Sequence, residues 1–218
     1  MEWALLGSLT AEQQQGLLSR SRRRKFAGDE VIFHEGDPGD TLHLLARGHV
    51  AVRRSTPLGD VATLLILGPG EFFGELVMLM SSQTGRNATV IALDSVETLT
   101  LHRDQLEELR RLYPAIDRFL LDALARDVRR LSSLLTEALY VPVEKRVLRR
   151  LLDVAKTYGG NSSGAVIPLT QENLAGLAGT SRPSANKVVR SAEEAGLLRV
   201  SRGQIELLDI EGLTRRAR

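Results

Sequence analysis

One stretch decides how the C-terminal part of this chain folds: Leu174-Ala175-Gly176-Leu177-Ala178-Gly179-Thr180-Ser181-Arg182-Pro183-Ser184-Ala185-Asn186-Lys187. Its first half has an apolar helical face, and Thr170 is a suitable N-cap for that helix. Gly179 breaks the helix, after which Thr180 or Ser181 caps a second one. Two helices joined by so tight a turn predict a helix-turn-helix.

The sequence on either side extends this motif into a domain. Apolar runs at 197–200 and 205–208 flank the turn Ser201-Arg202-Gly203-Gln204, which predicts a strand–turn–strand wing. On the other side, Pro142 opens a helix that runs to about Tyr158 and is closed by two glycines. Residues 140–218 are therefore expected to form a winged helix-turn-helix domain.

The second helix of the motif has the side chains that a DNA-reading helix needs. Such a helix enters the major groove, where Arg and Lys donate to guanine and Ser or Asn to phosphates or other bases. The candidate DNA-binding residues are Thr170, Ser181, Arg182, Ser184, Asn186, Lys187 and Arg202. Residues 139–218 hold 13 Lys and Arg against 8 Asp and Glu, whereas the rest of the chain holds 16 against 19. This imbalance favours double-stranded DNA as a partner.

A long helix is expected before this domain, at 113–139 and opening at Pro114. Apolar residues recur along it at alternating steps of three and four, which is the seam of a coiled coil. The candidate dimer-interface residues are Leu121, Leu124, Val128, Leu131, Leu135 and Ala138. A second strip, including Phe119 and Leu120, is expected to pack on the preceding domain. The alternative is that both strips are buried within one monomer.

The N-terminal segment reads as β-structure. Short apolar-alternating runs are separated by Gly, Asp and Pro, a pattern typical of a sandwich or barrel. The runs lie at 30–33, 41–45, 49–52, 62–66, 89–92 and 97–101. We therefore expect an α+β protein with three parts: a β-domain over 1–112, the long helix over 113–139, and the winged domain over 140–218.

Composition excludes several classes of protein. Hydrophobic residues make up 43% and charged residues 26% of the 218 residues, as in ordinary globular chains. The absence of cysteine excludes disulfides and thiolate metal sites, and the four histidines lack metal-ligand spacing. No apolar run is long enough to span a membrane, and the N-terminus lacks a signal-peptide pattern. No catalytic motif is present. A cytoplasmic protein that is not an enzyme and binds no metal is expected.

Several motifs in the same order resemble one family. They are Gly36-Asp37-Pro38-Gly39-Asp40-Thr41-Leu42, Gly48-His49-Val50-Ala51-Val52, Gly70-Glu71-Phe72-Phe73-Gly74-Glu75-Leu76, and the helix-turn-helix stretch itself. Over nearly its whole length the chain resembles the cyclic-AMP receptor protein/FNR (CRP/FNR) family of bacterial transcription regulators. The resemblance implies a cyclic-nucleotide-binding-like β-roll (a jelly roll), a dimerisation helix and a winged helix that reads a two-fold symmetric operator.

The resemblance also implies a phosphate-binding cassette. Gly74 would let the backbone approach a ligand, Glu75 would accept from a ribose hydroxyl, and Arg86 would neutralise a cyclic phosphate. The candidate ligand-binding residues are Gly74, Glu75, Leu76, Arg86, Asn87, Ala88 and, on the long helix, Ser133. No cofactor is required; cyclic AMP or another cyclic nucleotide is the leading allosteric ligand. The alternative is that Glu75 and Arg86 form an internal ion pair in an empty roll.

The expected partners follow from the same resemblance. They are double-stranded DNA, a second copy of the chain and RNA polymerase, with no membrane. A different class stays open, namely a cyclic-nucleotide-binding regulatory module whose C-terminal segment contacts protein rather than DNA. The basic run from Arg20 to Lys25 could contact DNA or the polymerase, or form an ordinary solvated face.

Overall fold

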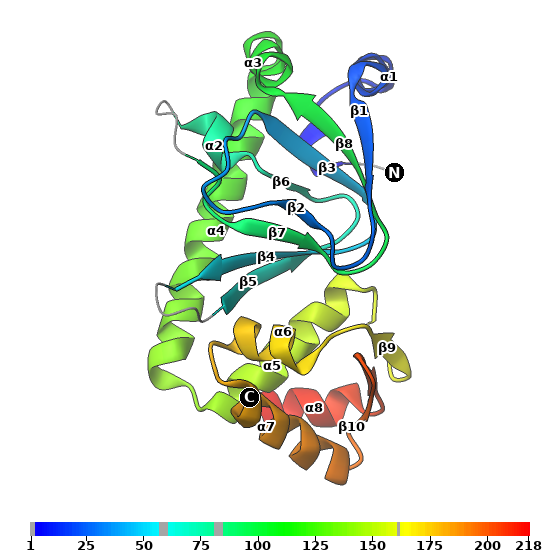
Figure 1. Ribbon diagram of the computed structural model, residues 1–218, viewed down its shortest axis with the longest axis vertical. Coiled ribbons are helices and arrows are strands. Elements are labelled where there is room, and N and C mark those ends of the chain that lie inside the picture. The colour runs from blue at the N-terminus through cyan, green and yellow to red at the C-terminus, as the bar shows by residue number, and fades with distance from the viewer. Residues whose placement is uncertain (1–2, 57–60, 81–84, 161) are drawn as a thin grey trace. The chain divides into compact units, whose positions relative to one another are not determined.

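A computed structural model gives the structure of the protein and describes residues 3–56, 61–80, 85–160 and 162–218. The chain forms two compact units (Figure 1). Unit one consists of Met1–Arg54 and Leu67–Arg130, and unit two of Ser55–Ile66 and Leu131–Arg218. The domain boundaries that the sequence predicts, after residues 112 and 139, divide the chain differently from these two units. They stay a prediction.

Unit one is built around two antiparallel sheets. The first has the order β1 (Arg22–Phe26), β8 (Val96–His102), β3 (Thr41–Arg47) and β6 (Phe72–Phe73). The second joins β2 (Val31–Phe33), β7 (Thr89–Ala92) and β4 (Val50–Ser55) in that order. The alternating runs expected in this region are therefore confirmed as strands. The basic run is exposed, as a solvated face would be, but it forms the edge strand β1, which the sequence did not predict.

Strand β3 is buried on both sides. Leu42 and Leu44 belong to the main core of this unit, together with Leu101 of β8. Because successive side chains of a strand point to opposite faces, His43 lies on the other face, toward the aromatic rings of Phe33 and Phe73. The face of β3 that bears His43 is therefore the interior of the β-roll.

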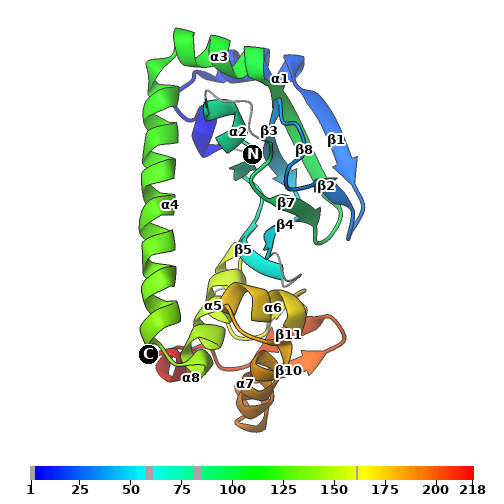
Figure 2. The same ribbon diagram turned by 60° about the vertical axis from the view of Figure 1, so that its left-hand side comes forward.

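Helices cover the outer face of the first sheet. They are the short η1 (Ala4–Leu6), α1 (Ala11–Arg20), α3 (Arg103–Leu112) and the first part of α4 (Pro114–Tyr140). One further turn of helix, α2 (Leu76–Leu79), follows β6. Leu120 of α4 is 2% exposed within the core, and Phe119 packs against it, so part of the second apolar strip has the expected role. Figure 2 shows α4 as one continuous helix.

Unit two contains the predicted winged helix-turn-helix. Helix α5 (Val143–Thr157) precedes the motif, which is formed by α6 (Gln171–Ala178) and α7 (Arg182–Glu194). The wing is the hairpin of β10 (Leu198–Ser201) and β11 (Gln204–Leu207), and β9 (Ala165–Ile167) pairs with β11 as a third strand. The C-terminal helix α8 (Ile210–Ala217) was not predicted.

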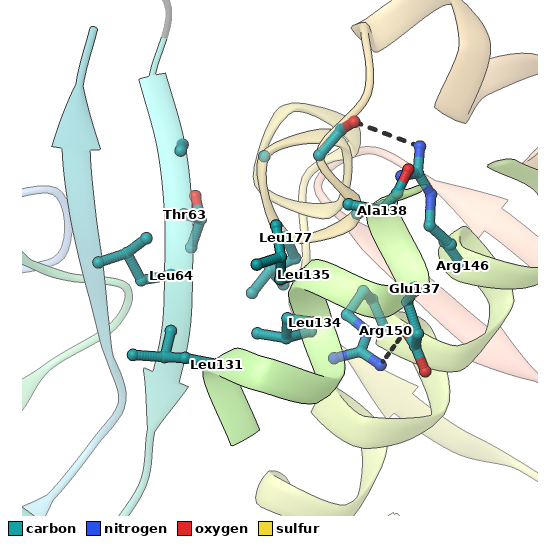
Figure 3. A pocket seen from close by; sticks show the side chains of 14 residues that line it. Thr63, Leu64, Leu131, Leu134, Leu135, Glu137, Ala138, Arg146, Arg150 and Leu177 are labelled. Carbon is teal, nitrogen blue, oxygen red and sulfur yellow. Dashed lines mark hydrogen bonds and ion pairs between the residues drawn. The ribbon is translucent and has the colours of Figure 1, made fainter. Parts of the chain in front are cut away.

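Most of strand β5 (Val61–Leu67) also belongs to unit two and borders a hollow of about 240 Å³ (Figure 3). Leucines of α4, namely Leu131, Leu134 and Leu135, line it together with residues of β5 and α6. Glu137, at the end of α4, accepts hydrogen bonds at 3.0 Å from both Arg149 and Arg150 of α5. These ion pairs hold the last turn of α4 against α5.

Candidate functional site

The turn between β6 and α2 carries the first predicted ligand residues. Gly74 has φ +87°, a conformation that favours glycine. Glu75 occupies the N-cap position of α2, and Leu76 is its first residue. Helix α2 is a single turn, so the case for an anion site depends on Arg86 rather than on a helix terminus.

Arg86 lies in a loop that is hydrogen-bonded to the β2–β3 connection, and its side chain extends to this turn. Its backbone amide donates to the carbonyl of Asp37 at 2.8 Å, and its own carbonyl accepts from the amide of Gly36 at 2.7 Å. The side chain donates from Nη1 to the Gly74 carbonyl at 2.8 Å and from Nη2 to the carbonyl and hydroxyl of Thr41 at 2.8 and 3.0 Å. The turn, the loop and β3 therefore meet at one guanidinium.

Two glycines make room for that guanidinium. A Cβ atom at Gly74 would lie 2.6 Å from Nη1 of Arg86, and one at Gly39 would lie 2.6 Å from its Nε. Either contact is too short for real atoms, so a side chain at either position would displace Arg86. The sequence motif that contains Gly39 contributes to the site in this way, which the sequence interpretation did not assign.

Arg86 is a buried cation whose hydrogen bonds in the described part of the chain go to neutral oxygens. It is 5% exposed, and its Nε has no hydrogen-bond partner among the described residues. Burial lowers the pKa of Arg86, while Asp40, Glu75 and Asp37 act at longer range to raise it. A buried charge without a directly bonded counter-ion is costly. The position therefore suits an anionic ligand.

The alternative of an internal Glu75–Arg86 ion pair is wrong, because the guanidinium bonds to Gly74 and Thr41 instead. Burial raises the pKa of the Glu75 carboxyl, an effect that Arg86 partly offsets. A desolvated carboxylate gains by accepting a hydrogen bond from a ligand hydroxyl.

His43 lies beside Arg86 in the roll interior and was not a candidate from the sequence. It is 1% exposed and stacks on Phe73 at 4.9 Å between ring centroids. Burial and the charges of Arg86 and Arg24 lower its pKa to about 3. The imidazole is therefore neutral at physiological pH.

This burial predicts a pH dependence of stability. Below pH 6.5 the unfolded chain protonates His43 while the folded protein does not, so acid favours the unfolded state. Between pH 7 and pH 5, we expect His43 to account for a loss of about 2 kcal/mol in unfolding free energy. Denaturant titrations should show a smaller loss for His43→Gln, whereas His102→Gln, which removes an exposed imidazole, should match the wild type. Equal losses in His43→Gln and the wild type would contradict this assignment.

The remaining predicted ligand residues are not all brought together. Ala88 is buried in β-roll structure at 2% exposure, whereas Asn87 beside it is exposed. Ser133 is exposed on the part of α4 that belongs to unit two. It lies about 140° around the helix from Val128, a residue of the predicted dimer seam. A contact of Ser133 with a ligand in the roll stays a prediction. The hollow of unit two includes none of the predicted ligand residues.

The helix-turn-helix has the local chemistry that the sequence indicated. Gly179 ends α6 with φ +58°, in the left-handed region. The Ser181 side chain caps α7 by accepting from the Ser184 amide, and Thr170 caps α6 by accepting from the Asn173 amide. Small and apolar residues of α7 are buried, namely Ala185, Val188, Val189 and Ala192. The opposite face of α7 is exposed.

Some cations of unit two have side chains without a hydrogen-bond or ion-pair partner among the described residues. Those on the exposed face of α7 and at the wing tip are Arg182, Lys187, Arg190 and Arg202. In contrast, Arg149 and Arg150 bind Glu137, Arg199 binds Glu206, and Arg216 binds Glu144. Cations without internal partners remain available for phosphates and base edges.

The polar candidates of the motif are already engaged within the protein. The Ser181 and Ser184 hydroxyls bond to each other at 2.9 Å, and the Asn186 amide donates to Gln171. Arg190, which was not among the candidates, is also exposed on α7. Contacts of the individual candidates with DNA stay a prediction.

The predicted dimer seam is largely solvent-exposed in the single chain. Leu121, Val128 and Leu135 are 63–65% exposed and Leu131 is 49% exposed. Leu124 is half-buried and Ala138 is exposed. The alternative that both apolar strips are buried within one monomer is therefore wrong for this strip. A dimer contact along it stays a prediction.

None of the helices among the described residues is both long and apolar enough to cross a membrane. No cluster of three or more His, Asp or Glu side chains in the same described ranges is arranged to hold a metal ion.

Three features define a DNA-binding regulator with a sensor domain. They are a β-roll with a buried arginine that suits an anionic ligand, a long helix, and a basic winged helix-turn-helix. Residues 23–113 match the cyclic nucleotide-binding domain, and residues 145–216 match the Crp-like helix-turn-helix domain. The CRP-like cAMP-activated global transcriptional regulator of Mycobacterium tuberculosis is 34% identical over 88% of this chain and 87% of its own length. The cyclic AMP receptor protein of Thermus thermophilus is 32% identical over 93% of this chain and 91% of its own length.

Solved structures agree in fold. The global regulator CLP of Xanthomonas campestris superimposes with a TM-score of 0.77 at 24% identity, covering 91% of this chain and 99% of its own. The chain belongs to the CRP/FNR family of bacterial transcription regulators. It is a DNA-binding regulator with a cyclic nucleotide-binding domain, and not an enzyme.

Proposed function

We propose that this chain is a homodimeric regulator whose DNA binding is controlled by cyclic AMP in the β-roll. The observation that carries the proposal is Arg86, a buried guanidinium cradled by two glycines and bonded only to neutral oxygens in the described structure. The M. tuberculosis relative is described as cAMP-activated and the T. thermophilus relative as a cyclic AMP receptor, which supports this nucleotide.

In this proposal each part of the site has one task. Arg86 donates to the cyclic phosphate, and Gly74 and Gly39 leave the space that its guanidinium needs. Glu75, whose pKa is raised by burial, accepts from the ribose hydroxyl. Leu76, Asn87 and Ala88 border the phosphate, and Ser133 contributes from α4. The nucleotide supplies the negative charge that the buried arginine lacks.

The dimer forms along the α4 seam and places two α7 helices on a two-fold symmetric operator. Ligand binding shifts the dimer between two states and brings the recognition helices to half-sites about one DNA turn apart. RNA polymerase is the expected further partner at the promoter, and the cytoplasm is the expected compartment.

A calorimetric titration with cyclic AMP, followed by duplex-binding assays with and without the nucleotide, tests the proposal. Saturable binding and a change in DNA affinity are expected. DNA affinity should also fall steeply with salt, because phosphate contacts release counter-ions. Absence of cyclic AMP binding, with DNA affinity indifferent to the nucleotide, would overturn the proposed control.

The free cations of α7 give a separate prediction for DNA affinity. Arg182→Ala or Lys187→Ala should each weaken operator binding by about 1–3 kcal/mol if the side chain reads a base, and relax specificity at one position. Fluorescence anisotropy with a labelled operator measures this. Lys156→Ala is a matched control, because Lys156 is exposed on α5 and pairs with Asp153. A loss in the control as large as in Lys187→Ala would show that general charge, not the α7 face, sets the affinity.

A further inference from the structure

The β-roll interior contains a polar side chain that the proposed function does not use. His43 is surrounded by rings: besides the stack on Phe73, its centroid lies 5.9 Å from Phe33 and 6.4 Å from Phe26. A polar group buried among rings is costly unless it is hydrogen-bonded. The two ring nitrogens of His43 meet this need with two threonines.

Of the two threonines, Thr98 lies away from the predicted ligand residues and Thr41 lies next to them. Nδ1 of His43 is 3.2 Å from the Thr98 hydroxyl, and Nε2 is 3.5 Å from the Thr41 hydroxyl. Thr41 is also the residue to which Nη2 of Arg86 donates, at both its carbonyl and its hydroxyl. One hydroxyl therefore lies between the imidazole and the guanidinium.

Donor and acceptor counts give this arrangement a direction. Arginine has donors only, so Thr41 accepts from Arg86 and keeps its own hydroxyl proton to donate. A neutral imidazole has one accepting nitrogen, and Nε2 faces the Thr41 hydroxyl. In the tautomer that carries the ring proton on Nδ1, in which Thr41 can donate, the chain of bonds runs from Arg86 to Thr41, from Thr41 to Nε2 of His43, and from Nδ1 of His43 to Thr98.

Aromatic contacts also link Arg86 to His43. The guanidinium carbon of Arg86 lies 4.2 Å from the centroid of Phe33, within the range of a cation–π contact. Phe33 in turn lies 6.0 Å from Phe73, on which His43 stacks. His43 thus supports both surfaces against which Arg86 rests, the Thr41 hydroxyl and the ring cluster.

We propose that His43 is a positioning residue for the ligand site, which fixes the Thr41 hydroxyl and through it the guanidinium of Arg86. The expected effect of His43 on cyclic AMP affinity rests on the proposed function. Its effect on the position of the Arg86 guanidinium does not. Neither His43 nor Thr41 touches the ligand through its side chain in this assignment.

Substitutions at His43 separate its hydrogen bond from its ring. His43→Phe keeps a ring for the stack on Phe73 but removes the acceptor for Thr41. His43→Gln loses the ring and keeps an amide that can reach Thr41. We expect cyclic AMP affinity of the full-length dimer to fall about tenfold in His43→Phe, and to recover at least partly in His43→Gln.

Thr41 tests whether His43 acts through it. Thr41→Val should weaken cyclic AMP binding by a similar factor, and the double variant His43→Phe/Thr41→Val should be no weaker than Thr41→Val alone. Thr41→Ser, which keeps a hydroxyl, is the conservative variant and should restore most of the affinity that Thr41→Val loses. Additive losses in the double variant would overturn the proposed route through Thr41.

A spectroscopic readout covers the case in which the wild type binds no cyclic AMP. The Nε–H nitrogen resonance of Arg86, assigned by its loss in Arg86→Lys, should shift in the same direction in His43→Phe and Thr41→Val, and should stay unchanged in His102→Gln. If the resonance shifts but no variant binds cyclic AMP, the ligand assignment fails and the positioning role survives. If it does not move, and any cyclic AMP binding is unchanged in His43→Phe, the positioning role is overturned.

Discussion

Arg86→Ala is expected to cost about 2–5 kcal/mol of cyclic AMP binding free energy, enough to abolish saturation at ordinary concentrations. The reason is the burial of the guanidinium, which is 5% exposed and has no directly bonded carboxylate in the described structure. A ligand phosphate placed there would make charge-assisted hydrogen bonds in a poorly solvated position. Calorimetry on the variant measures the loss, and DNA binding should no longer respond to the nucleotide.

Three companion measurements distinguish a lost contact from a damaged fold. Alanine leaves the carbonyls of Gly74 and Thr41 without their donor, so unfolding free energy should also fall, by about 1–3 kcal/mol. Arg86→Lys keeps the charge but not the planar fork and should bind at an intermediate level. Arg54→Ala removes an exposed arginine that pairs with Glu35 and should change neither property much. Wild-type affinity in folded Arg86→Ala would remove Arg86 from the site.

The double variant Leu121→Glu/Leu135→Glu is expected to convert the dimer to a monomer. Both leucines lie on the α4 seam and are 65% and 63% exposed in the single chain. In a dimer they would be buried, and an unpaired carboxylate there would cost about 3–5 kcal/mol. Sedimentation should then report the 24.0 kDa chain rather than twice that mass. Operator affinity should fall as well, because one recognition helix would remain per particle.

A control on the same helix accounts for the added charge. Arg129 is exposed on α4, about 80° around the helix from Leu121 and 120° from Leu135. Arg129→Glu should therefore leave the sedimentation coefficient close to that of the wild type. A dimeric Leu121→Glu/Leu135→Glu variant would show that the chain associates through another surface.

The sequence predicted those elements whose apolar residues form short runs bounded by turn residues. Strand β7 alternates between half-buried and buried residues, whereas β3 and β8 are buried along most of their length. Gly179 and Ser181 mark the turn and cap of the helix-turn-helix by their backbone chemistry. Strand β1 has no such pattern, because four of its five residues are exposed and basic and only Phe26 is buried. An edge strand needs little apolar content, so the composition of this segment indicated only a basic, solvated face and not a strand.

The ligand site was predicted only where a motif marked it. Arg86 and Gly74 lie in a recurring pattern, but two of the three oxygens that hold Arg86 are backbone carbonyls, which leave no trace in the residue types. His43 was hidden for another reason: Thr98 lies 55 residues away from it, and only the pairing of β3 with β8 brings them together. Such contacts depend on strand register, which the sequence pattern does not fix for a strand buried on both sides.

The division between paired and unpaired cations in unit two has a practical consequence for handling the protein. The formal net charge of the chain is only +2, which predicts weak retention on a cation-exchange resin. A heparin column presents a polyanion, however, and should bind exposed cations that have no internal counter-ion, among them Arg182, Lys187, Arg190 and Arg202. Substitution of any of these four should therefore lower the salt concentration at which the protein elutes from heparin, whereas Lys156→Ala, which removes a cation paired with Asp153, should lower it less.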